Sequence, residues 1–286
     1  MIYAICNPAA GSGRGKKIGL QVEEALKKKG KTFTLVMTEG PGHATQLAAQ
    51  IPDGETVLSI GGDGTSLEVA RGLLGTRKTL GIIPAGTGND FIKTLNIPSD
   101  PMEALEYVLS HPALETDVGE LNGGMFLNEA GAGFDVAVLD DAQRAKKYCR
   151  GLLPYLYGVI RAVFRFRPIS IAYQVDDGGW ITKDVFVIGA ANGGVIGGGI
   201  VIAPEAAADD GLLDVVIVGD IKRSRLPLRL IGLLRGRILD FPETTYLKAR
   251  SVLFSAPQMR VNVDGEIVDM PEASIRILPK ALLIHR

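Results

Sequence analysis

Gly61-Gly62-Asp63-Gly64-Thr65 is the stretch that decides the fold of the first part of the chain. It follows an apolar, β-branched run at Thr56–Ile60 and precedes a stretch with helical periodicity, Ser66–Leu74. Glycines between a strand and a helix let backbone N–H groups approach an anion closely, and the helix N-terminus adds partial positive charge. The stretch therefore predicts a strand, an anion-binding turn and a helix.

Two further turns of the same kind lie on either side of it. Asn7-Pro8-Ala9-Ala10-Gly11-Ser12-Gly13 follows the run Ile2–Cys6, and Pro84-Ala85-Gly86-Thr87-Gly88-Asn89-Asp90-Phe91 follows Thr79–Ile83. Strands that alternate with helices predict a parallel, doubly wound sheet, in which ligands bind beyond the carboxyl ends of the strands. A single turn is better interpreted as a plain connection between a strand and a helix, but three together favour a phosphate site.

The pattern of the chain changes near Asp117. Asn122-Gly123-Gly124 and residues 176–179 each separate two apolar runs, which is typical of hairpins. We therefore expect a boundary near residue 118, followed by mainly antiparallel β structure with helical pieces near 137–167 and 224–238. The longest uncharged stretch, Val185–Pro204, contains six glycines and predicts a strand, a glycine-rich loop and a strand rather than a membrane span.

Composition excludes several classes of protein. The 286 residues suit two domains, and 31 basic against 32 acidic residues give a net charge of −1, so a protein-wide basic field for nucleic acid is excluded. Two cysteines and three histidines argue against a disulfide scaffold or a thiolate zinc site, and a cytoplasmic protein is expected. The 36 glycines exceed the ~7% norm.

Acidic residues beside the glycine turns indicate a cation. Asp63 lies inside one turn and Asp90 ends another, and a bare carboxylate beside a phosphate implies a bridging divalent ion. Mg²⁺ with a nucleoside triphosphate fits, although each aspartate alone could cap a helix. Asp117 is a weaker third candidate for a carboxylate that helps to hold this cation. Neither the P-loop pattern nor the dinucleotide fingerprint is present, because Lys16 and Lys17 stand where those patterns need other residues.

These motifs together resemble one family. Gly61–Thr65 resembles the signature shared by diacylglycerol, sphingosine and NAD kinases and, more loosely, 6-phosphofructokinases. Asn7-Pro8, Gly86–Phe91 and Thr38 with Gly42-His43-Ala44 are similar to the lipid-kinase branch. Residues 126–135, 209–214 and 263–266 are similar to that branch's second domain. The chain, from residue 3 to about 283, thus resembles a bacterial soluble diacylglycerol-kinase-type lipid kinase.

The resemblance implies a fold and a set of ligands. It implies a doubly wound α/β nucleotide-binding domain at 1–118, completed by a return strand at 278–286, and an antiparallel β-sandwich lipid domain at 119–277, with ATP between them. The expected nucleotide-binding residues are Asn7, Ser12, Gly13, Thr38, Gly61, Gly62, Asp63, Gly64, Thr65, Ser66, Leu67, Glu68, Gly86, Thr87 and Asn89. Asp63, Asp90 and Asp117 would organise a catalytic Mg²⁺ through water. Ala207, Asp210 and Leu212 would hold a structural Mg²⁺.

A second acidic turn contains the residues expected to act on the hydroxyl that accepts the phosphate. Asp264 and Glu266 flank Gly265 between two short strands, which by itself is typical of a solvent-facing hairpin. The family match makes them candidates for the catalytic carboxylates, with Asp63 on the nucleotide side. We predict that Glu266 is the general base and Asp264 its close partner, and the reverse assignment stays open.

Two segments carry basic and apolar residues without an acid. The first, residues 142–167, contains Arg144, Lys146, Lys147, Arg150, Arg161, Arg165 and Arg167; the second, residues 222–237, contains Lys222, Arg223, Arg225, Arg229, Arg235 and Arg237. The pattern suits peripheral contact with an anionic membrane and equally suits solvated amphipathic helices. No nucleic-acid partner is expected.

The sequence therefore predicts an ATP- and Mg²⁺-dependent kinase acting on a hydroxyl of a membrane lipid. An NAD kinase and a non-catalytic nucleotide or lipid sensor of the same fold are the alternatives. The acceptor lipid, the oligomeric state (a homodimer is one option) and the role of the loop Gly189–Gly199 stay open.

Overall fold

The computed structural model describes residues 1–145 and 153–286. Lys146, Lys147 and Arg150 of the first basic segment, and Cys149, lie outside the described residues. The described chain divides into two compact units. Unit 1 comprises Met1–Val118, Ala208–Gly211 and Leu278–Arg286, and unit 2 comprises Gly119–Ala207 and Leu212–Ile277.

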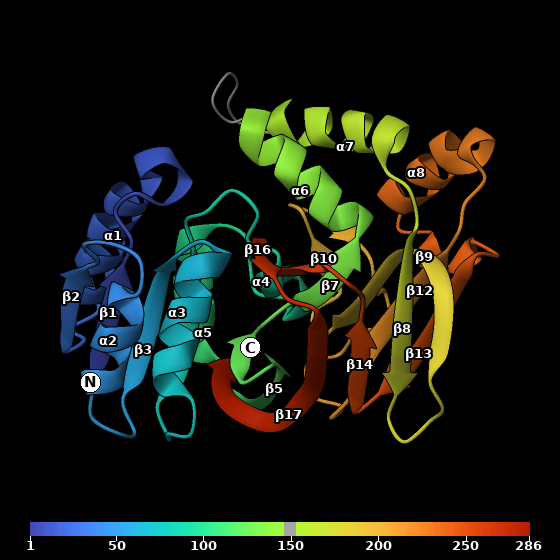
Figure 1. The fold of residues 1–286 in the computed structure, drawn as a ribbon. Helices are drawn as coiled ribbons and strands as arrows, with labels where there is room; N and C mark the ends of the chain where they lie inside the picture. The colour runs from blue at the N-terminus through green and yellow to red at the C-terminus, as the bar shows by residue number, and fades with distance from the viewer. Residues whose placement is uncertain (146–152) are drawn as a thin grey trace. The chain divides into compact units, whose positions relative to one another are not determined.

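Unit 1 contains a parallel sheet. Its strands lie in the order β17-β4-β3-β1-β2, and every neighbouring pair is parallel. In Figure 1, the blue strands β1, β2 and β3 run beside α1 and α2. The strands that begin in this unit are β1 Ile2–Cys6, β2 Phe33–Met37, β3 Thr56–Gly61, β4 Thr79–Pro84 and β5 Ala113–Leu121.

Helices connect these strands. They are α1 Ala10–Lys28, α2 His43–Gln50, α3 Asp63–Leu73, α4 Phe91–Thr94 and α5 Pro101–Ser110. Helix α1 packs Ile18, Val22 and Leu26 inward at the predicted helical spacing. Helix α3 begins at Asp63, earlier than the predicted Ser66, so the glycine turn and the first turn of the helix are one structure.

One long strand passes from one unit to the other. The strand β17, Glu272–His285, pairs antiparallel with β14 along 272–276 and parallel with β4 at Leu283 and Ile284. Residues 208–211, which lie inside the predicted second domain, belong to unit 1. Unit 1 is therefore assembled from three separate stretches of sequence.

Unit 2 is built from antiparallel strands. The strand β9 pairs with β7, β8 and β12, and β14 pairs with β8. Its strands are β6 Gly124–Phe126, β7 Glu129–Gly133, β8 Ile169–Val175, β9 Ile181–Ala191, β10 Val195–Ile196, β11 Ile200–Val201, β12 Leu213–Gly219, β13 Thr244–Ala249, β14 Ser251–Ser255, β15 Arg260–Val263 and β16 Glu266–Asp269. The predicted fold class, an α/β domain followed by a β-sandwich, is confirmed.

The strands of unit 2 are apolar on both faces. Along β12, Leu213, Val215 and Ile217 pack into the core between the strands, whereas Val216 and Val218 belong to a second cluster. Successive side chains of a strand point to opposite faces, so β12 is covered on both sides. The second cluster is closed by helices, which lie above the strands of this unit in Figure 1.

The helices of unit 2 are α6 Phe134–Ala145, α7 Leu153–Arg165 and α8 Leu226–Leu234, with short 3₁₀ turns at Arg223–Arg225 and Ile238–Asp240. The predicted helical pieces near 137–167 and 224–238 correspond to these elements. Within residues 1–145 and 153–286, no helix combines the length and the apolar content that crossing a bilayer needs.

Candidate functional site

The carboxyl ends of β1 and β3 form the centre of the candidate nucleotide site in unit 1. In the order β4-β3-β1-β2, the chain leaves β1 toward β2 and then returns to the other side of β1 as β3. Open parallel sheets bind their ligands at such a switch point. Asn7 follows β1 directly, and its Nδ2 donates to Thr65 Oγ1 at 3.1 Å, which ties the first glycine turn to the second.

The third turn is joined to the other two by backbone and side-chain bonds. Gly61 O accepts hydrogen bonds from the N–H groups of Ala85 and Gly86, and Arg14 Nη2 donates to Gly86 O at 2.8 Å. A Cβ at Gly86 would lie 2.5 Å from the Cα of Gly62, so this approach of two backbones requires glycine. The structure thus brings all three predicted turns together.

The first turn has an unusual backbone. Gly11, Ser12 and Gly13 all have positive φ, at 57°, 60° and 95°. Ser12 and Gly13 are exposed, and the Gly13 N–H donates to Ala9 O at 3.2 Å. Left-handed backbone at a residue other than glycine is uncommon, and it concentrates at functional turns.

Some predicted nucleotide-binding residues already have structural contacts. The side chains of Ser66 and Leu67 are buried, and the Ser66 hydroxyl lies 3.3 Å from that of Ser59. The Glu68 carboxylate accepts the N–H groups of Gly42 and Ala44, at the start of α2. These side chains therefore stabilise the second glycine turn through contacts inside unit 1.

The other predicted nucleotide residues lie at strand ends and in the third turn. Thr38 follows β2, and its N–H donates to Cys6 O. Thr87 is exposed. The Asn89 amide both accepts from Gly86 N and donates to Gly86 O, which closes the third turn on itself.

Asp63 and Asp90 form an acidic pair between the second and third turns. Asp63 Oδ1 accepts the N–H groups of Asp90 at 2.7 Å and Phe91 at 3.2 Å, and Asp90 Oδ1 accepts from Lys93 Nζ at 2.7 Å. A Cβ at Gly88 would lie 3.2 Å from Asp63 Oδ2 and 3.3 Å from Asp90 Oδ2, so both carboxylates face this glycine. Burial raises the pKa of the Asp63 carboxyl, and the charge of Asp90 adds to the effect.

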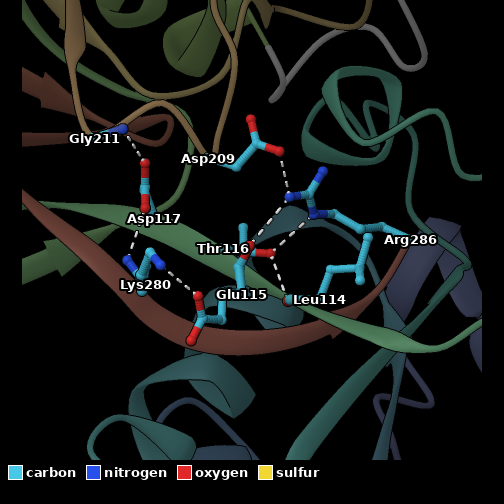
Figure 2. Close-up of polar contacts among 8 residues, drawn as sticks. All are labelled: Leu114, Glu115, Thr116, Asp117, Asp209, Gly211, Lys280 and Arg286. Carbon is cyan, nitrogen blue, oxygen red and sulfur yellow. Dashed lines mark hydrogen bonds and ion pairs between the residues drawn. The ribbon is translucent and has the colours of Figure 1, made fainter.

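Asp117 lies in a different set of contacts. Figure 2 shows its carboxylate between two backbone segments: Oδ1 accepts from Lys280 N and Oδ2 accepts from Gly211 N, each at 2.7 Å. Beside it, Arg286 donates to Thr116 Oγ1, to Glu115 O and to Asp209 Oδ2. We call these residues of unit 1 the Arg286 clasp: Glu115, Thr116, Asp117, Asp209, Gly211, Lys280 and Arg286. The clasp ties β5, the stretch 208–211 and β17 together.

The predicted structural Mg²⁺ ligands lie in one short stretch. Ala207 and Leu212 are half-buried and Asp210 is exposed. The neighbouring Gly211 has a φ of 74°, so the chain turns sharply directly after the carboxylate.

The acidic pair is compatible with Mg²⁺. Its donors are carboxylate oxygens, which this ion prefers, and Mg²⁺ commonly takes one or two carboxylates and completes its shell with waters and phosphate oxygens. Within the described residues, no group of three or more His, Cys, Asp or Glu side chains could hold a metal. Asp63 and Asp90 could therefore hold the ion only together with such further ligands.

In unit 2, the Asp264 carboxylate organises a turn. Oδ2 accepts the N–H of Leu127 at 2.7 Å, and Oδ1 accepts those of Asn128 at 2.8 Å and Glu129 at 3.0 Å. Its backbone has a φ of 49° and its own N–H donates to Glu129 O. Asp264 thus fastens β15 to the start of β7.

Glu266 differs from Asp264 in its surroundings. It begins β16 and its side chain is exposed. Next to it, Gly265 N donates to Asn262 Oδ1, and Asn262 Nδ2 donates to Glu129 Oε1 at 3.0 Å. One carboxylate of the predicted pair therefore holds the turn and the other is open to solvent.

Several residues of these sites were not predicted. Arg14 joins the first and third glycine turns, and Glu129 joins β7 to Asn262 beside the acidic turn of unit 2. Arg14 had a local signal, because it is the first basic residue after the first glycine turn. Glu129 lies in the motif 126–135, but the motif gave it no role, since its partner Asn262 is 133 residues away in sequence.

Comparison with known proteins identifies the family to which both parts of the chain are similar. The model of the diacylglycerol kinase catalytic domain matches residues 1–121, and the model of the YegS C-terminal NAD kinase beta sandwich-like domain matches residues 128–286. A diacylglycerol kinase of Mycobacterium tuberculosis (strain CDC 1551 / Oshkosh) is 30% identical over 294 residues, covering 100% of this chain and 94% of that protein.

Solved structures are similar as well. A protein from Bacillus anthracis str. Sterne, proposed to be a diacylglycerol kinase, superimposes with a TM-score of 0.81 at 27% identity, covering 99% of this chain and 94% of the other. An NAD kinase from Archaeoglobus fulgidus, solved with ATP, has a TM-score of 0.54 at 16% identity over 100% of this chain and 94% of the other. At that identity only the fold is shared.

The fold and the two matched domains define a protein of the lipid kinase class. The chain belongs to the diacylglycerol kinase family, with the YegS-type second domain. For the alternative function, an NAD kinase, the similarity to this chain is limited to the fold.

Proposed function

We propose that this protein transfers the γ-phosphate of ATP, with Mg²⁺, to a hydroxyl group of a membrane lipid such as diacylglycerol. The observation that carries the proposal is the contact of three glycine turns around the Asp63–Asp90 pair. Phosphoryl transfer depends mainly on positioning and on neutralising the phosphate charge. N–H groups of the turns, Arg14 and a Mg²⁺ held by Asp63 and Asp90 would supply that neutralisation.

The acceptor hydroxyl needs a base, and we propose that Glu266 takes its proton. Glu266 is exposed, whereas Asp264 already accepts three backbone N–H groups. A carboxylate that is open to solvent can approach a hydroxyl, and one that is fully engaged positions the turn instead. Asp264 therefore acts as a positioning residue.

Activity assays with matched variants test the proposal. Labelled ATP is offered with Mg²⁺ to diacylglycerol, to other hydroxyl lipids and to NAD, and products are identified by mass. We expect label in a lipid, dependence on Mg²⁺, and a loss of about 10²–10⁴-fold in Glu266→Gln at unchanged ATP affinity. Glu272→Gln, another exposed glutamate of unit 2, is the control. Label in NAD alone, or undiminished turnover in Glu266→Gln, would contradict the proposal.

We also propose that the enzyme is cytoplasmic and contacts the membrane through the two basic segments. Helix α7 exposes Leu156, Ile160 and Phe164 at helical spacing, and Phe164 is 74% exposed. Helix α8 exposes Leu228 and Ile231. Large apolar side chains beside exposed arginines suit insertion into the interface of an anionic bilayer.

Part of the basic charge is already neutralised. Arg161 pairs with Asp141, Arg229 with Glu243 and Arg237 with Asp240. Within the described residues, the members of the two segments without an ion pair are Arg165, Arg167, Lys222, Arg223 and Arg235. These cations would supply the salt-sensitive part of binding.

Vesicle sedimentation tests the membrane contact. Binding should rise with the fraction of anionic lipid, fall with salt, and weaken at least tenfold in Phe164→Glu. Trp180→Glu, which changes an exposed aromatic side chain outside the two segments, should bind as the wild type does. Salt-insensitive binding, or equal loss in both variants, would contradict the contact.

A further inference from the structure

The hairpin that carries Glu266 is attached to the rest of unit 2 by few backbone bonds. Its second strand, β16, lies at the end of the sheet and, among the described residues, pairs with β15. Its first strand, β15, is joined to β7 through a register that covers Asn262 and Val263. A two-stranded hairpin has little stability of its own in water, so side-chain contacts must fix its direction.

The turn of this hairpin is short and sharply bent. Val263 pairs with Glu266, and two residues lie between them. These residues, Asp264 and Gly265, have φ values of 49° and 91°, and a two-residue turn of this kind requires such left-handed backbone. Glu266 comes next in the chain, so the direction of its side chain depends on how Gly265 is held.

The Asn262 side chain holds this glycine from inside unit 2. Val261 packs into the core between the strands, so the next side chain points to the opposite face of β15, where Asn262 is 4% exposed. Its Oδ1 accepts the N–H of Gly265 at 2.9 Å. Because a backbone N–H can only donate, this bond fixes the orientation of the amide, and Nδ2 donates to Glu129 Oε1 at 3.0 Å. One amide therefore joins the turn to a carboxylate of β7.

Helix α6 lies on the same face of β15. Arg260, two residues before Asn262, pairs with Asp140 of this helix at 2.5 Å. The carboxylate oxygens of Asp135, the second residue of α6, are buried without a hydrogen-bond partner among the described residues. Burial raises the pKa of the Asp135 carboxyl, and the neighbouring Asn262 amide partly offsets this. Asn262 is therefore enclosed between β7 and α6 and has little freedom to turn.

We propose that Asn262 is a positioning residue for phosphoryl transfer, which binds the Gly265 N–H and Glu129 together and thereby fixes the direction of Glu266. The inference rests on the proposed function, in which Glu266 takes the proton of the acceptor hydroxyl. It adds to the role of Asp264, whose carboxylate fastens the turn to the N–H groups of residues 127–129. The turn is then held through the side chain of one central residue and the N–H of the other.

Removal of the amide should lower turnover rather than nucleotide affinity. Turnover of labelled ATP is measured with diacylglycerol as the acceptor. Because a misplacement of about 1 Å can cost about 10²-fold in rate, we expect Asn262→Leu to lower kcat about 10- to 100-fold. The KM for ATP should not change, since the glycine turns lie in unit 1. Exchange of the Gly265 amide hydrogen should become faster, and Val268→Thr, at an exposed position of the same hairpin, should match the wild type.

A double-mutant cycle separates positioning from general damage. If Asn262 acts through Glu266, Asn262→Leu should have little further effect on kcat once Glu266→Gln has removed the base. Damage to the fold of unit 2 would instead lower kcat by the same factor in both backgrounds. Glu129 gives a second route if Asn262→Leu does not fold. Glu129→Met removes the acceptor of the amide, whereas Glu129→Gln keeps an oxygen there and should retain about tenfold more activity.

The outcomes distinguish the positioning role from the proposed function. A loss of kcat in Asn262→Leu that is confined to the background with Glu266 intact supports the role. Full turnover in Asn262→Leu beside an inactive Glu266→Gln, or equal losses in both backgrounds, overturns the role and leaves the kinase function. Equal activity of Glu129→Met and Glu129→Gln overturns it as well. Undiminished turnover in Glu266→Gln, or a wild-type protein that phosphorylates no lipid, contradicts the proposed function and removes the positioning role with it.

Discussion

Replacement of Asp264 tests whether its carboxylate positions the acidic turn, as proposed, or acts as the base in place of Glu266. Its side chain accepts the N–H groups of Leu127, Asn128 and Glu129 at 2.7–3.0 Å. A hydrogen bond to a charged group contributes about 1.5–3 kcal/mol, and N–H groups left without a partner add their desolvation cost. Three such bonds are not additive, so we expect Asp264→Ala to lower the free energy of unfolding of unit 2 by about 3–5 kcal/mol.

Asp264→Asn serves as the intermediate variant. Asparagine tolerates the left-handed φ of 49° and keeps one acceptor oxygen, so it should lose less stability than alanine. Urea unfolding can be followed at Trp180, the single tryptophan of the sequence, which lies in unit 2. Hydrogen exchange of Leu127, Asn128 and Glu129 gives a second, local measurement, and their protection should fall in Asp264→Ala.

The matched control is Asp269→Ala, which removes an exposed carboxylate from the same hairpin. Its effect should stay within about 0.5 kcal/mol, as is usual for surface positions. If Asp264→Ala destabilises unit 2 no more than Asp269→Ala does, the positioning role is wrong. Asp264 would then be free to act as the base, and the assignment of Glu266 would have to be reversed.

Three further perturbations act on unit 1. Gly86→Ala should weaken ATP binding at least tenfold in calorimetry, because its Cβ would meet the Gly62 backbone, whereas Gly40→Ala, with open space around it, should be neutral. Cys6, whose pKa burial raises from the ordinary 9.0 to about 11, should resist iodoacetamide at neutral pH by mass spectrometry. Because the unfolded thiol ionises first, its contribution to stability should fall between pH 9 and about 11, and Cys6→Ala should remove that slope. Arg286→Ala should speed hydrogen exchange at 208–211, and Arg286→Lys should restore protection only in part.

The elements of unit 1 were predictable because their signals are local. Strand, glycine turn and helix follow one another within about a dozen residues, and the acidic residues lie inside the turns themselves. Helix α5 was missed although its start carries a local signal: the Asp100 side chain accepts the N–H groups of Met102 and Glu103, and Pro101 is the first helical residue. An aspartate directly before a proline is a capping signal that predicts the start of such a helix.

The contacts that give Asp264 and Asp117 their roles could not be predicted from local sequence patterns. The bonds of Asp264 reach residues more than 130 positions earlier, and those of Asp117 reach Gly211 and Lys280. No local pattern distinguishes a carboxylate that fastens a turn from one that faces solvent. The side-chain bond that anchors Asn262 was hidden for the same reason, because it spans 133 residues of sequence.

The long strand β17 has a consequence for how the protein is made. Among the described residues, the edge of β4 gains its parallel neighbour from Leu283 and Ile284, and unit 1 also includes residues 208–211. A ribosome therefore delivers β1 to β4 long before the last strand of their sheet, and domains that form early usually do so from contiguous sequence. During synthesis the β4 edge stays unpaired, which is a site for wrong strand pairing. Completion of unit 1 should thus be among the last events of folding.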